Sequence, residues 1–104
     1  MKSIDALEAQ FKQELCIALR RAAKGRSPTI FSLDENRSRS SARRLRAKAE
    51  RIMELRQTYS VDRSAVPPAA RYLATCLKWK PGADAHAVQV AARNLLQELE
   101  GHAT

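Results

Sequence analysis

Glycine and proline residues divide the chain into four long segments, and in each segment apolar residues recur at three- and four-residue spacing. The breaks fall at Gly25, at Ser27-Pro28, at Pro67-Pro68 and at Pro81-Gly82. This spacing places apolar side chains on one face of an α-helix. No segment has the alternating pattern that is typical of a strand. The sequence therefore predicts an all-α fold, a small four-helix domain.

Residues that commonly begin helices stand at the start of each segment. Ser3 and Asp84 are suitable N-caps, and Ser32 with Glu35 fits a capping box. Proline at position 67 is tolerated in the first turn of a helix. The predicted helices span about residues 4–24, 33–59, 67–80 and 84–100.

The length of 104 residues suits one domain, and we expect residues 1–104 to form it. A hydrophobic content of 44% is too high for a disordered chain. The opening "MKSIDALEAQFKQE" carries acids where a signal peptide has its apolar run. No segment approaches the roughly 20 apolar residues of a membrane span, so we expect a cytoplasmic protein that does not contact membranes.

Residues with catalytic or metal-binding chemistry are few and scattered. Cys16 and Cys76 share no metal-ligand spacing, and both stand in apolar helical segments, so we expect two reduced, mostly buried thiols. His86 and His102 have no cysteine or carboxylate partner at ligand spacing. The sequence thus predicts a protein that is not an enzyme and that holds no metal or cofactor.

The most unusual stretch is residues 35–51, "ENRSRSSARRLRAKAER", which holds six arginines and a lysine but only two acids. At 100° per residue its helix has one apolar stripe, which we expect to be buried. The stripe contains Ala42, Leu45, Ala49, Ile52, Met53 and Tyr59. On another side of the helix Glu50 and Glu54 lie among Arg39, Arg43 and Arg46. Each acid has a basic residue three or four positions away with which it could pair.

A second ridge of this helix carries Arg37, Arg44, Lys48 and Arg51 with no acid between them. It could bind phosphate groups of nucleic acid, each contact weakening with salt, or it could be a solvated face or the rim of a protein interface. No aromatic residue is interleaved with the arginines, so stacking on single strands is not indicated. A net charge of +8 attracts polyanions generally, and we expect weak, non-specific binding to nucleic acid.

Two helices carry more apolar surface than one core needs. In the third helix the apolar arc is wider than the roughly 100° of a core-facing helix. Tyr72 and Trp79 lie on one edge of this arc. They could anchor a protein interface, or they could pack beneath the loop of residues 25–32. On the first helix Leu7, Phe11 and Leu15 share a face that suits either the core or an exchangeable arm. We expect protein-binding residues among these five, and a homodimer.

The whole chain, which opens with "MKSIDALEAQFKQELCIALRRA", resembles the small bacterial antiactivators of quorum sensing in length and helical layout. The resemblance implies a protein that binds a LuxR-type transcription factor and prevents its action at promoters. It contains no short motif, so no site residue is carried over from the family. A small basic nucleic-acid-binding protein or transcriptional regulator, using the second ridge, is the alternative function.

Overall fold

The computed structural model describes residues 3–34, 39–59, 66–80 and 82–101, and four α-helices make up most of this part of the chain. They are α1 (Ile4–Ala23), α2 (Ser40–Thr58), α3 (Pro68–Lys78) and α4 (Ala85–Gly101). The predicted all-α, four-helix fold is therefore confirmed. None of the described helices is both long and apolar enough to cross a membrane.

Local capping sets three of the four helix starts close to the predicted positions. The Ser3 side chain accepts a hydrogen bond from the Ala6 amide at 3.2 Å, and Asp84 Oδ1 accepts one from the Ala87 amide at 2.7 Å. Pro68 occupies the first turn of α3, where a missing amide hydrogen costs nothing. Gly25 follows α1 with a φ of +82°, a conformation that favours glycine.

The predicted start of the second helix at Leu33 is wrong, because Leu33 and Asp34 are not helical and α2 begins at Ser40. The Ser32 hydroxyl accepts a hydrogen bond from the Asp34 amide at 3.2 Å, which forms a local turn. Serine and aspartate commonly offer the backbone such an alternative to a helix. Glu35, the other half of the predicted capping box, lies outside the described residues.

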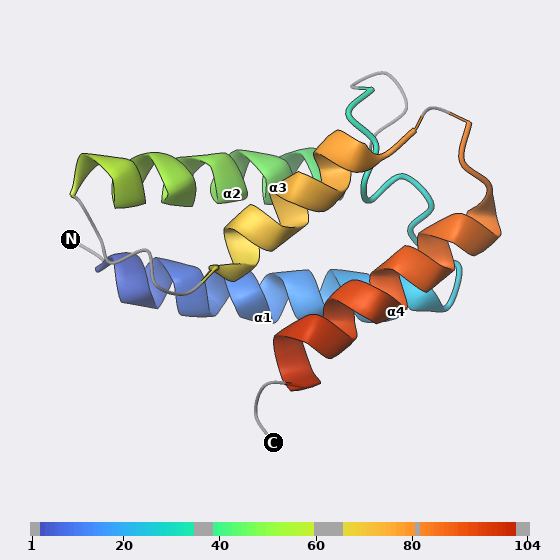
Figure 1. The fold of residues 1–104 in the computed structure, drawn as a ribbon, viewed down its shortest axis with the longest axis horizontal. Coiled ribbons are helices and arrows are strands. Elements are labelled where there is room, and N and C mark those ends of the chain that lie inside the picture. Colours follow the sequence, from blue (N-terminus) through green and yellow to red (C-terminus); the bar gives the residue numbers. More distant parts are fainter. Residues whose placement is uncertain (1–2, 35–38, 60–65, 81, 102–104) are drawn as a thin grey trace.

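Helix α1 is the centre of the arrangement, because it packs against each of the other three helices. In Figure 1 α1 and α2 run along the long axis of the molecule, while α3 and α4 cross them obliquely. Helices α2 and α4 do not contact each other. The largest fully buried side chains are Tyr72, Phe11, Phe31, Leu15, Leu19 and Cys76.

Residues 24–34 fold back over the core and are held there by Tyr72. Its hydroxyl donates a hydrogen bond to the Ile30 carbonyl at 2.7 Å. Its ring lies 6.2 Å from the ring of Phe11 and 6.2 Å from that of Phe31, and Phe31 in turn contacts Trp79 at 5.2 Å between centroids. Aromatic rings at these separations attract one another beyond simple burial. The aromatic cluster therefore joins α1, α3 and the connection between α1 and α2.

Candidate functional site: a groove between α2 and α3

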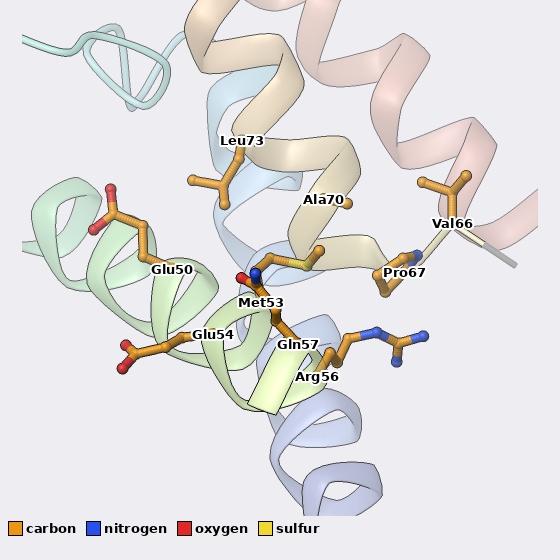
Figure 2. A pocket seen from close by; sticks show the side chains of 9 residues that line it. All are labelled: Glu50, Met53, Glu54, Arg56, Gln57, Val66, Pro67, Ala70 and Leu73. Atoms are coloured by element: carbon orange, nitrogen blue, oxygen red, sulfur yellow. The ribbon is translucent and has the colours of Figure 1, made fainter. Parts of the chain in front are cut away.

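A surface groove of about 660 Å³ lies between the second half of α2 and the first half of α3 (Figure 2). Hereafter it is called the α2–α3 groove. It is lined by Glu50, Met53, Glu54, Arg56, Gln57, Val66, Pro67, Ala70 and Leu73. Its volume lies within the range of about 300–1,000 Å³ that is usual for binding clefts.

The middle of the groove is apolar. Met53 of α2 points toward α3, where Ala70 and Leu73 face it (Figure 2). Ala70 is small and therefore leaves room between the two helices, while Met53 and Leu73 are half-buried against the core. Methionine adapts readily to different partner shapes. Val66 at the entry to α3 is exposed and extends this apolar surface at one edge.

The opposite edge of the groove is acidic. Glu50 and Glu54 are four residues apart on α2, so both side chains lie on one face of the helix, as Figure 2 shows. Both residues are exposed. Glu54 has Arg51 as an exposed ion-pair partner at 3.5 Å, whereas among the described residues Glu50 has no ion pair. The edge is thus locally acidic in a chain with a net charge of +8.

Arg56 ties the groove to α1. Its Nη1 donates to Glu8 Oε1 at 2.5 Å, and the two side chains are only 11% and 18% exposed. A pair so shielded from water is screened less than an exposed one. This contact fixes the end of α2 against α1 and so supports one wall of the groove.

None of the five residues that were predicted to bind a protein is exposed in the structure. Phe11, Leu15 and Tyr72 are buried in the core, as the alternative interpretation of the two helices allowed. Leu7 is half-buried beside a small hollow between α1 and α2. Trp79 is half-buried and lines a separate hollow of about 360 Å³ next to Leu33. None of the five lines the α2–α3 groove.

The apolar stripe predicted for α2 is correct except at its end. Ala42, Leu45, Ala49 and Ile52 are buried and Met53 is half-buried, but Tyr59 is 63% exposed. Tyr59 is the C-cap of α2 and follows its last helical turn.

The predicted pairing of each acid with a base three or four residues away is confirmed for Glu54, which pairs with Arg51, but it is wrong for Glu50 and Arg46. Arg46 is 8% exposed, and its Nη1 donates to the Ser32 carbonyl at 2.7 Å. The side chain thereby links α2 to the folded-back connection. Among the described residues Glu50 is therefore left without an ion pair at the groove edge, a consequence that helical periodicity alone does not reveal.

The predicted basic ridge is interrupted. Lys48 Nζ donates to both carboxylate oxygens of Glu14 on α1, at 2.9 and 2.8 Å. Arg51 faces Glu54, as described above. Within this ridge of α2 itself no acid stands between the cations, but Glu14 reaches Lys48 from α1, a contact that the spacing within one helix does not reveal. Arg44 is the only described residue of the ridge without an ion pair, and Arg37 lies outside the described residues.

Both cysteines are free and buried, as predicted. Burial raises the pKa of the Cys16 thiol, with a further contribution from the Glu100 carboxylate. Burial also raises the pKa of Cys76 from 9.0 to about 11. In the part of the chain that the structure describes, no three His, Cys, Asp or Glu residues are grouped so that they could hold a metal ion.

Comparison of the chain with protein-family models, with curated proteins and with solved structures finds no match.

Proposed function

We propose that this chain is a regulatory protein without catalytic activity that binds and inhibits a LuxR-type transcription factor by protein–protein contact, and that the α2–α3 groove receives the partner. The observation that carries the proposal is the combination of an apolar floor and an acidic edge in one groove. Grooves of this kind between two helices commonly accept the apolar face of a further helix. The choice of partner rests on the resemblance to the antiactivators of quorum sensing.

The acidic edge indicates that the bound segment of the partner carries basic side chains. Glu50 and Glu54 present two carboxylates one helical turn apart. A complementary segment would place apolar side chains against Met53 and Leu73 and a lysine or arginine near each acid. Charge complementarity of this type speeds association and rejects acidic competitors. DNA-binding proteins are rich in such basic segments because they neutralise phosphates, so a transcription factor is a suitable partner.

The basic ridge supports the alternative function less well. Lys48 and Arg51 both have acidic partners, and Arg44 is the remaining described cation of the ridge. A helix that binds a phosphate backbone in the way the ridge was expected to would need several unpaired cations in a row.

The proposal is tested by filling the groove. Ala70→Trp places a large ring in a space of about 660 Å³ and should weaken binding of a purified LuxR-type factor at least tenfold, a loss of about 1.4 kcal/mol. Ala74→Trp is the matched control, because Ala74 is an exposed residue of α3 that does not line the groove. Circular dichroism establishes that both variants are folded. Equal affinities for the two folded variants would contradict the assignment of the groove.

The acidic edge is tested by a second pair of variants. Glu50→Gln/Glu54→Gln should slow association and reduce its dependence on salt. Glu98→Gln/Glu100→Gln changes the net charge by the same amount on α4, where these acids pair with Arg71 and Arg20 and do not line the groove. If both double variants slow association equally, the effect is one of overall charge and the acidic edge has no part in recognition.

A further inference from the structure

Another hollow, of about 190 Å³ and distinct from the one beside Leu7, lies at the opposite end of α2, where the second half of α1 meets the start of α2. It is called the α1–α2 hollow below. Its lining consists of Glu14, Ile17, Ala18, Arg21, Ser27, Ser41, Arg44 and Leu45. None of these residues lines the α2–α3 groove.

Two guanidinium groups border this hollow from different helices. Arg21 belongs to the last turns of α1 and Arg44 to the first turns of α2, and their helices pack side by side. Both residues are exposed, and among the described residues neither forms an ion pair. Like charges held at one small site repel each other, and an anion between them would turn that repulsion into attraction.

Two hydroxyl groups complete the polar lining. Ser27 precedes Pro28 in the connection after α1, and Ser41 stands in the first turn of α2. Neither hydroxyl has a hydrogen-bond partner among the residues that the structure describes. Guanidinium groups match the geometry of phosphate oxygens, and hydroxyls can donate to the remaining ones. The donor set therefore fits a tetrahedral oxyanion.

The other lining residues are compatible with such a ligand. The Glu14 carboxylate is held by Lys48 Nζ at 2.8 Å, so its charge is balanced within the protein. Ile17, Ala18 and Leu45 form an apolar wall, and Ile17 is 46% exposed. This wall could contact the carbon framework that carries a phosphate group.

We propose that the α1–α2 hollow binds a phosphate group, as a phosphate ester or a phosphodiester, between Arg21 and Arg44. The proposal does not depend on the α2–α3 groove or its partner. Of the residues in the predicted basic ridge, the proposed site uses Arg44 and does not use Lys48. It adds Arg21, a cation from α1.

Titration with inorganic phosphate, followed by NMR of the arginine side-chain Nε–H groups, tests the site. In the wild type the signals of Arg21 and Arg44 should shift together. Arg21→Gln and Arg44→Gln should each weaken binding about tenfold, the loss expected for one charge-assisted contact. Arg43→Gln is the matched control, because Arg43 is an exposed neighbour on α2 outside the lining and should change affinity less than about twofold.

Two results would overturn the proposal. One is an equal loss in all three variants, which would indicate general charge attraction only. The other is the absence of any shift of the Arg21 and Arg44 signals at about 10 mM phosphate, about ten times a dissociation constant of 1 mM. Because the three arginines are exposed, circular dichroism should find every variant folded.

A short DNA duplex in an anisotropy assay identifies the source of the phosphate. If Arg21→Gln and Arg44→Gln weaken duplex binding more than Arg43→Gln does, the site takes a phosphodiester. If the three variants weaken duplex binding equally while inorganic phosphate binding stays selective, the site takes a small phosphorylated molecule. Both results support the hollow as a phosphate site.

Discussion

Replacing Tyr72 by phenylalanine removes one oxygen atom and tests whether this residue belongs to the core. The Tyr72 hydroxyl donates to the Ile30 carbonyl at 2.7 Å, and the side chain is 0% exposed. Water therefore cannot replace the lost donor. A buried polar group left without its partner costs about 1–3 kcal/mol. We expect Tyr72→Phe to lower the free energy of unfolding by that amount.

Thermal and urea unfolding followed by circular dichroism measure this change. For a domain of this size each 1 kcal/mol lowers the melting temperature by about 4 °C or more. Tyr59→Phe is the matched control, because Tyr59 is 63% exposed and its replacement should stay within about 0.5 kcal/mol of the wild type. Equal stabilities for the two variants would refute the role of Tyr72 in holding residues 24–34 over the core.

Three further predictions follow from burial and from the sequence. Phe11→Ala should cost about 3–5 kcal/mol in urea unfolding because the ring is 2% exposed, and a cost below about 1 kcal/mol would place Phe11 at the surface. Because burial raises the pKa of Cys76 from 9.0 to about 11, the unfolded thiol loses its proton first, so stability should fall by about 2–3 kcal/mol as the pH rises from 9 to 11. The stability of Cys76→Ala should fall less over the same pH range, because the variant has no thiol at this position. An equal fall in the wild type and in Cys76→Ala would contradict the role of this thiol. The homodimer stays a prediction: light scattering should give about twice the chain mass of 11.6 kDa, whereas a monomer at micromolar concentration would exclude it.

Signals confined to a few neighbouring residues were sufficient to predict much of the fold. The N-caps at Ser3 and Asp84 bind amides three residues away, so these helix starts can be predicted from the neighbouring residues alone. The apolar period likewise predicts which side of each helix faces the core. The start of α2 was not predicted correctly, because Ser32 forms a local turn with Asp34 in place of a helix cap. Residues 24–34 are also held by contacts with residues far along the chain. Tyr72, 42 positions beyond Ile30, is one of them.

The α2–α3 groove could not be predicted from the sequence, again because it depends on contacts between residues far apart in the chain. A helical wheel assigns Glu50 and Glu54 to basic neighbours on the same helix. Glu54 does pair with Arg51, but Arg46, the basic neighbour of Glu50, donates to the Ser32 carbonyl instead. Likewise, the wheel leaves Lys48 unpaired, whereas Glu14 reaches it from α1. Partners on other helices thus decide which charges remain available. The α2–α3 groove itself depends on the placement of two helices relative to each other, and no periodicity within either helix specifies that placement.

A hydrogen-exchange footprint of the chain, with and without a purified LuxR-type transcription factor, tests whether the α2–α3 groove receives the partner. If the α2–α3 groove receives the partner, binding should slow exchange in peptides covering 50–57 and 66–73, and α4 should exchange at its former rate because none of its residues lines the groove. Protection of α4 or of the outer face of α1, with unchanged exchange along the groove, would contradict the claim.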